Sequence, residues 1–248
     1  MIMSVNRPVM VIVAGANGSG KSSNTVQFVR EGYDVIDPDR IARNLSPNAP
    51  EKMAVSAGKS AINRARENIQ NGVSFSIETT LSSKGVYQRL VNEAKKQSFI
   101  IKLAYISTEH PSINIERIKE RVANGGHHVP DVDVVRRYER SLENVSGFFN
   151  QADEVCFVDN SRLSSDMRVQ LHAKGSEQIH KIAPQNELCQ WVTKALGQDV
   201  IEKLYASHNK HYELGNSIVS KHESAYKSKE RSQQSTRSPD QNHKKFER

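Results

Sequence analysis

Cysteine is nearly absent from this chain: Cys156 and Cys189 are its two cysteines among 248 residues. They have neither the C-x-x-C spacing nor the neighbouring histidines of a zinc site, and their apolar surroundings indicate reduced core thiols. Long apolar runs are missing as well. Residues 1–8 hold no stretch that could serve as a signal peptide, and no run approaches the length of a membrane span. We therefore expect a cytoplasmic protein without a membrane partner.

Negative charge is in shorter supply than positive charge. The chain has 35 Lys and Arg against 28 Asp and Glu, which gives a net charge of +7, and residues 207–248 contribute +4 of it through nine basic and five acidic side chains. That segment is rich in Ser, Lys, Gln and His and lacks apolar periodicity, so we predict a basic, disordered tail after a folded domain at residues 1–206. Its three aromatics, Tyr212, Tyr226 and Phe246, are too sparse to form a base-stacking platform. Nucleic acid is therefore not an expected partner.

A phosphate-binding motif follows an apolar run at residues 9–14. Residues 15–22 match the pattern G-x-x-x-x-G-K-[ST], in which glycines turn backbone N–H groups toward an anion, a lysine reaches the outer phosphates and a hydroxyl binds Mg²⁺. The motif predicts a site for ATP and Mg²⁺, with Ser22 as the metal ligand. The expected nucleotide-binding residues are Gly15, Ala16, Asn17, Gly18, Ser19, Gly20, Lys21, Ser22 and Ser23. By itself the motif leaves ATPases, GTPases and kinases open.

Strand-like and helix-like segments alternate through most of the chain. Candidate strands are residues 9–14, 34–36, 73–77, 100–106 and 154–158. Candidate helices are residues 22–30, 54–71, 86–96 and 112–123, with another beginning near residue 131. This order predicts an α/β P-loop NTPase or kinase fold, a mostly parallel sheet flanked by helices. A hairpin around residues 174–176 and an amphipathic helix with Leu188, Trp191, Val192 and Leu196 are expected at the C-terminal side.

Carboxylates follow two of the expected strands. Asp37 and Asp39 come after residues 34–36, and Glu78 and Thr80 come after residues 73–77. Ligands of open α/β sheets bind at the carboxyl ends of strands, and phosphoryl transfer needs a base for the acceptor hydroxyl and carboxylates for Mg²⁺. Glu78 could serve substrate hydroxyls or Mg²⁺, and a threonine could orient the acceptor. The alternative for each residue is a helix cap or a surface turn.

A cationic segment suggests a lid. Arg117, Lys119 and Arg121 lie in an expected helix that ends in the glycines at residues 125–126, and the next helix carries Arg136, Arg137 and Arg140. Helices joined by a glycine-rich hinge suit a helical lid that brings arginines to the transferring phosphoryl group. The alternative is two solvated helix faces. His127 and His128 have no Cys or Glu at useful spacing, so we interpret them as loop residues rather than zinc ligands.

Five motifs in order resemble the zeta toxin family of bacterial P-loop kinases over roughly residues 8–196. They are Gly15-Ala-Asn-Gly-Ser-Gly-Lys-Ser, Asp37-Pro-Asp-Arg-Ile-Ala, Glu78-Thr-Thr-Leu-Ser, Glu120-Arg-Val-Ala-Asn-Gly-Gly-His-His-Val-Pro with Arg136-Arg-Tyr-Glu-Arg-Ser-Leu-Glu-Asn, and Val158-Asp-Asn-Ser. The resemblance implies ATP-dependent phosphorylation of a hydroxyl of UDP-N-acetylglucosamine, toxicity through cell-wall synthesis, and an antitoxin protein as a possible partner.

The resemblance also implies roles for single residues. Lys21 and Ser22 hold phosphates and Mg²⁺, Asp39 matches the general base, Glu78 and Thr80 match substrate-binding positions, and Arg121 matches the first lid arginine. The family's second lid arginine is missing from the segment before Val129, where Gly126, His127 and His128 stand. Arg136 is our first choice to replace it, with Arg137 and Arg140 as alternatives.

Two other functions stay open at this point. The chain could phosphorylate another hydroxyl acceptor, such as an antibiotic or a nucleoside. It could also be a non-catalytic ATP-binding regulatory module associated with nucleic acid. A nucleotide switch does not need both Asp39 and Glu78 at strand ends, which favours the enzyme.

Overall fold

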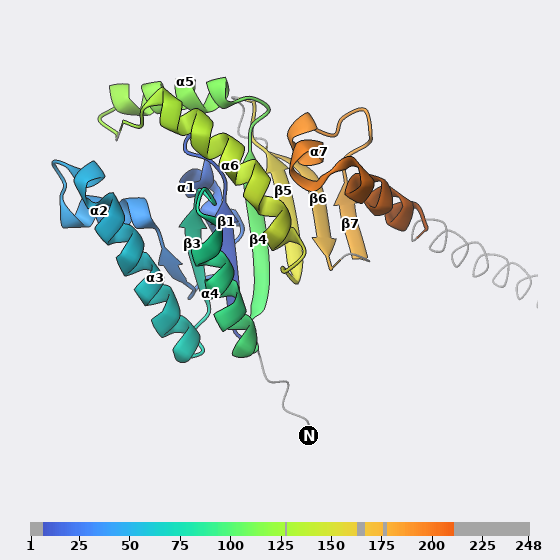
Figure 1. Cartoon of the computed structure of the whole chain (residues 1–248), viewed down its shortest axis with the longest axis horizontal. Helices are drawn as coiled ribbons and strands as arrows, with labels where there is room; N and C mark the ends of the chain where they lie inside the picture. The colour runs from blue at the N-terminus through green and yellow to red at the C-terminus, as the bar shows by residue number, and fades with distance from the viewer. Residues whose placement is uncertain (1–6, 127, 163–166, 176–177, 211–248) are drawn as a thin grey trace, which may run out of the picture.

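The computed structural model describes residues 7–126, 128–162, 167–175 and 178–210. Seven strands form one sheet in the order β2-β3-β1-β4-β5-β6-β7 (Figure 1). The strands are β1 (Val9–Ala14), β2 (Asp34–Ile36), β3 (Phe75–Thr79), β4 (Ile100–Ser107), β5 (Glu154–Asp159), β6 (Arg168–Lys174) and β7 (Gln178–Ile182). The mixed α/β fold with a mostly parallel sheet is the fold that the alternating pattern predicts.

The first five strands run parallel. β1 lies between β3 and β4, with Ile12 opposite both Ile77 and Leu103, and this central strand is buried on both faces because helices and connecting segments cover both. The carboxyl ends of β1, β2, β3, β4 and β5 therefore meet at one edge of the sheet. All side chains with a predicted catalytic role follow this edge or lie in the helices above it.

Four helices cover one face of the sheet (Figure 1). They are α3 (Ala54–Gln70), α4 (Lys84–Lys96), α6 (Asp131–Phe149) and α7 (Gln190–Leu196). Small residues of α3 and α4 pack closely on the strands. On the same face, Trp191 of α7 stacks on Phe157 of β5 with ring centroids 6.1 Å apart. The helix α5 (Pro111–Ala123) lies with the start of α6 beyond the carboxyl edge, where a lid is expected (Figure 1).

The opposite face of the sheet has a thinner cover. Phe28 and Tyr33, from the segment between β1 and β2, pack on Val11 and Val13, and Cys156 lies nearby and half-buried. Burial raises the pKa of this thiol to about 11 and that of Cys189 to about 12. Both cysteines are free, which agrees with the prediction of reduced thiols.

Only part of the expected helix at residues 22–30 is present. The structure has α1 (Lys21–Asn24) followed by a 3₁₀ turn, η1 (Thr25–Gln27). Asn24 Nδ2 donates to Gly20 O at 2.8 Å. Such side-chain bonds to the backbone compete with helix formation, which explains the early end.

Three further helical segments differ from the sequence prediction. The helix α2 (Pro38–Leu45) and the turn η2 (Pro50–Met53) lie between β2 and α3. Neither is among the candidate helices, although the helix-cap alternative for Asp37 implies a helix at the position of α2. Residues 198–210 are helical, with Ile201 and Leu204 buried, so ordered structure extends past residue 206. Most of the expected tail, residues 211–248, lies outside the described residues. Among the described helices none is long and apolar enough to cross a membrane.

Candidate active site

The phosphate loop between β1 and α1 has the backbone that its glycines permit. Gly18 and Gly20 have φ angles of +78° and +92°, in the left-handed region. A Cβ atom on Gly18 would overlap the backbone of Asn114, and one on Gly20 would overlap the side chain of Asn160. The left-handed conformation disfavours other residues at both positions, and at Gly18 the backbone of Asn114 also leaves no space for a Cβ.

Three side chains from distant elements hold this loop in place. Asn114 of α5 donates to Asn17 O at 2.8 Å, Arg137 of α6 donates to Asn17 Oδ1 at 2.8 Å, and Asn160 after β5 donates to Ser19 O at 2.8 Å. Sequence reasoning did not single out Asn114 or Asn160. Two features of the sequence could have identified them. Asn160 lies in one of the five motifs, and Asn114 is a polar residue on the buried side of an amphipathic helix.

Lys21 begins α1 and lies among carboxylates. Its Nζ donates to Ala16 O at 3.0 Å. Burial lowers the pKa of Lys21, while the charges of Glu78, Asp39 and Asp37 act in the opposite direction. The three acidic side chains from the ends of β2 and β3 are thus close enough to the lysine to stabilise its charged form.

Glu78 is the second-last residue of β3 and so lies inside this strand rather than after it. It is buried, with 6 % of its surface exposed, and accepts hydrogen bonds from Ser22 Oγ and Thr25 Oγ1, both at 2.7 Å. Thr80, the other position that the family pattern marks for substrate, pairs its hydroxyl with Ser82 Oγ at 2.9 Å. Ser23, the last residue of the predicted nucleotide set, is exposed on α1.

The two aspartates after β2 have different surroundings. Asp37 is the N-cap of α2, where its Oδ1 accepts from Asp39 N at 2.9 Å and its Oδ2 lies 3.7 Å from Arg43. Asp39 is exposed in the first turn of the same helix. The capping alternative thus describes Asp37, and Asp39 keeps its carboxylate available.

Asp39 lines a cavity of about 760 Å³ between α2 with η2 on one side and the loop between α5 and α6 on the other. Arg43, Arg121 and His128 also line it. The volume falls within the usual range of small-molecule sites, about 300–1,000 Å³. Glu78 and Thr80 are not among its described lining residues.

The arginines of the expected lid lie in three different places. Arg121, in the last turn of α5, faces the cavity, and Gly126 N donates to Arg121 O at 2.8 Å so that the loop folds back over it. Arg136 is exposed and forms an ion pair with Asp133, with 2.8 Å between N and O. The structure brings Arg137, rather than Arg136, to the phosphate loop.

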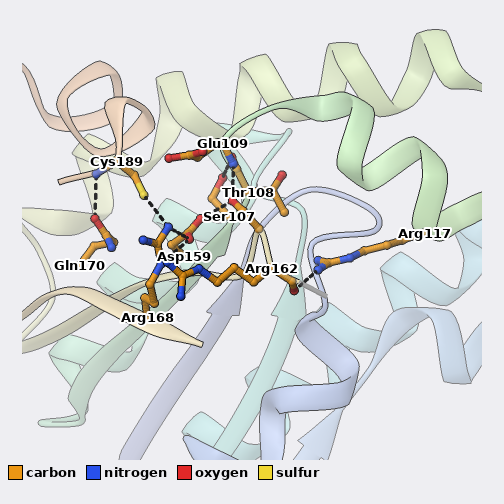
Figure 2. Close-up of polar contacts among 10 residues, drawn as sticks. Ser107, Thr108, Glu109, Arg117, Asp159, Arg162, Arg168, Gln170 and Cys189 are labelled. Atoms are coloured by element: carbon orange, nitrogen blue, oxygen red, sulfur yellow. Dashed lines mark hydrogen bonds and ion pairs between the residues drawn. The ribbon is translucent and has the colours of Figure 1, made fainter. Parts of the chain in front are cut away.

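A buried ion pair supports the loop after β5 (Figure 2). Asp159 Oδ2 accepts from Arg168 at 2.7 and 3.2 Å, and Asp159 Oδ1 accepts from Ser161 Oγ at 2.5 Å. Ser161 Oγ in turn accepts from Glu109 N at 2.8 Å. These contacts hold the residues that flank Asn160 and so support its bond to the phosphate loop.

A family model for zeta toxins matches residues 2–174. The chain belongs to the zeta toxin family. An uncharacterized protein of Haemophilus influenzae is 36% identical to this zeta toxin over 129 residues, which are 52% of this chain and 91% of the relative.

Solved structures share the fold. One, from the PezAT chromosomal toxin-antitoxin system of Streptococcus pneumoniae, superposes with a TM-score of 0.53 and 17% identity over 85% of this zeta toxin and 88% of that chain. Another, the AvrRxo1-ORF1:-ORF2 complex with ATP, has a TM-score of 0.57 and 12% identity over 77% of this chain and 64% of the other. This zeta toxin therefore has the fold of P-loop kinases.

The residues of this zeta toxin fit a nucleoside triphosphate with a divalent metal. The left-handed glycines give the loop between β1 and α1 the backbone that its phosphate-binding motif requires, and Lys21 donates back to this loop at Ala16 O. Oxygen donors of the kind that Mg²⁺ prefers, the Ser22 hydroxyl and the Glu78 carboxylate, adjoin each other. Among the described residues, no group of three or more His, Cys, Asp or Glu side chains is arranged to hold a metal ion.

Proposed function

We propose that this zeta toxin transfers the γ-phosphoryl group of ATP to a hydroxyl of a UDP-amino sugar, UDP-N-acetylglucosamine. The observation that carries the proposal is the placement of Asp39. Its carboxylate lines the cavity that Arg121 also lines, and it is near enough to Lys21 of the phosphate loop to influence the pKa of that amine. A base and a cation thus line one cavity, and the base lies close to the phosphate loop.

In the proposed reaction, Asp39 accepts the proton of the acceptor hydroxyl as its oxygen attacks the γ-phosphorus, and the bond from that phosphorus to the β–γ bridging oxygen breaks. Lys21 and the backbone of the loop hold the phosphates in line with the acceptor. Arg121 and Arg137 neutralise charge on the transferring group. Mg²⁺, when bound at Ser22, would shield the phosphate oxygens from one another.

Arg137 takes the place that the family's second lid arginine leaves vacant in the sequence. Its bond to Asn17 puts a guanidinium against the phosphate loop, whereas the guanidinium of Arg136 is engaged by Asp133. A cation at the loop neutralises phosphate charge without any movement of the lid. We therefore assign the role to Arg137 in preference to Arg136.

A protein partner is part of the proposal. The PezAT structure belongs to a toxin-antitoxin system, and the AvrRxo1 structure is a complex of two gene products. Together with family membership, these support an antitoxin that binds this chain and restrains it.

The acceptor is tested with the purified chain, Mg-ATP and separate candidates, followed by mass spectrometry for an added phosphate. The panel holds UDP-N-acetylglucosamine, N-acetylglucosamine 1-phosphate, a nucleoside and an aminoglycoside. We expect phosphate on the UDP-sugar. If only the nucleoside or the aminoglycoside gains a phosphate, the proposed substrate is wrong and the assignment of a kinase stands.

One observation favours the second candidate, a kinase for another hydroxyl acceptor. The described side chains around the cavity include prolines, arginines and His128 but no Phe, Tyr or Trp on which a uracil could stack. In the panel, this candidate is favoured if N-acetylglucosamine 1-phosphate is phosphorylated as fast as the UDP-sugar, because the uridine then contributes nothing to recognition.

A further inference from the structure

The carboxylate of Glu78 is held by two hydroxyls. Oε2 accepts from Ser22 and Oε1 accepts from Thr25, each at 2.7 Å. Both hydroxyls come from the short segment that follows the phosphate loop. The two bonds together fix the plane of the carboxylate, because rotation about the last side-chain bond would break both.

Glu78 and Ser22, the expected metal ligand, adjoin a cavity that is separate from the acceptor cavity. Glu78, Ser22, Thr25 and Asp37 line a second cavity, of about 530 Å³, on the phosphate-loop side of α2. The acceptor cavity with Asp39 is lined by other described residues. The resemblance to the family implies a substrate contact for Glu78, whereas its contacts here are with the hydroxyl that is expected to bind Mg²⁺.

Thr25 is well placed to control this carboxylate. It is 4 % exposed, and it lies where the helix after the loop changes to a 3₁₀ turn. Its hydroxyl has one proton and two acceptors within reach, Glu78 Oε1 at 2.7 Å and Lys21 O at 3.0 Å. The shorter bond to a carboxylate is the stronger, so the proton belongs to Glu78.

We propose that Thr25 is a positioning residue that orients Glu78 toward a divalent metal bound with the nucleotide at Ser22. Glu78 then acts on the metal side of the site. This inference rests on the proposed function only in requiring that the chain binds a metal-nucleotide complex, and it holds for any acceptor.

The test measures the affinity for ADP by calorimetry across a Mg²⁺ titration and again in EDTA. Thr25→Val keeps the shape and removes the hydroxyl, and Thr25→Ser keeps the hydroxyl. We expect Thr25→Val to raise the Mg²⁺ concentration for half-maximal binding about 10-fold, the usual effect of losing a group that orients a metal ligand. Thr25→Ser should stay within about 2-fold of the wild type, and binding in EDTA should not change.

A double-mutant cycle with Glu78→Gln asks whether Thr25 acts through Glu78. If it does, Thr25→Val adds less than about 2-fold to the effect of Glu78→Gln, because the two changes remove one interaction. Equal loss of affinity in Mg²⁺ and in EDTA contradicts the proposal, since it would reveal a purely structural role. Full additivity of the Thr25→Val and Glu78→Gln effects also contradicts the proposal. A changed KM for the acceptor with an unchanged Mg²⁺ requirement contradicts it as well.

Two controls keep the outcomes separate. Melting temperature identifies a variant that does not fold, and Thr25→Ala then replaces Thr25→Val in the same cycle. A wild-type chain that binds no Mg-nucleotide contradicts the proposed function and this inference together. A wild-type chain that binds it while Thr25→Val and Glu78→Gln behave like the wild type contradicts this inference alone.

Discussion

Removing Arg168 should destabilise the fold by breaking the ion pair under the loop after β5 (Figure 2). The carboxylate of Asp159 has no exposed surface, and Arg168 has 32 % of its side chain exposed. Loss of one partner from a buried pair costs about 3–5 kcal/mol because a charge stays buried without compensation. Since water reaches Arg168 and Ser161 still donates to Asp159, we expect Arg168→Met to reduce the free energy of unfolding by about 2–3 kcal/mol.

Urea denaturation followed by circular dichroism measures this change, and calorimetry should record a melting temperature lower by roughly 4–12 °C. Lys194→Met is the matched control, because it breaks an exposed pair with Glu139 whose side chains are 56 % and 42 % exposed. It should cost about 0–1 kcal/mol. The reasoning is refuted if Arg168→Met destabilises the chain no more than Lys194→Met does.

Three further outcomes are expected. Lys21→Ala should abolish phosphate transfer, because Lys21 neutralises the outer phosphates; turnover near the wild-type rate would remove this lysine from the site. Gly126→Ala should lower kcat, because its Cβ would overlap both the backbone and the side chain of Arg121, whereas Gly58→Ala on α3 has open space and should leave kcat unchanged and stabilise the helix by about 0.5–1 kcal/mol. Cys156 and Cys189 should react slowly with a thiol reagent at pH 8, because with pKa values of about 11 and 12 they are almost entirely protonated there; fast labelling without denaturant would contradict their burial.

The strands were largely predictable from the sequence. β1 and β2 have the predicted bounds. A short run of strand-forming residues between turn residues leaves little choice of where the strand begins and ends. β3 is shifted toward its C-terminus and includes Glu78 and Thr79. Polar residues at the end of a strand look like a turn in the sequence, and here the hydroxyls of Ser22 and Thr25 compensate the buried Glu78.

The phosphate loop was also predictable, whereas the contacts that support it were not. The motif identified the loop because its glycines carry the conformation themselves. The supporting bonds join Asn17 to Asn114 and Arg137, residues that lie far along the chain, and no local pattern indicates such pairs. The choice between Arg136 and Arg137 depended on which side of α6 faces the loop, which is decided by the packing of the helix.

Transfer of phosphate from ATP to UDP-N-acetylglucosamine, measured by mass spectrometry for wild type and Asp39→Asn in parallel, tests the central claim most directly. The substitution Asp39→Asn keeps the size of the side chain and removes its basicity. The kcat should therefore fall by roughly 10²–10⁴ while the affinity for ATP stays nearly unchanged. Phosphorylated UDP-sugar from the wild type, and almost none from Asp39→Asn, is the expected result. Equal product from both contradicts the assignment of the base, and ATP consumption without any phosphorylated UDP-sugar contradicts the proposed substrate.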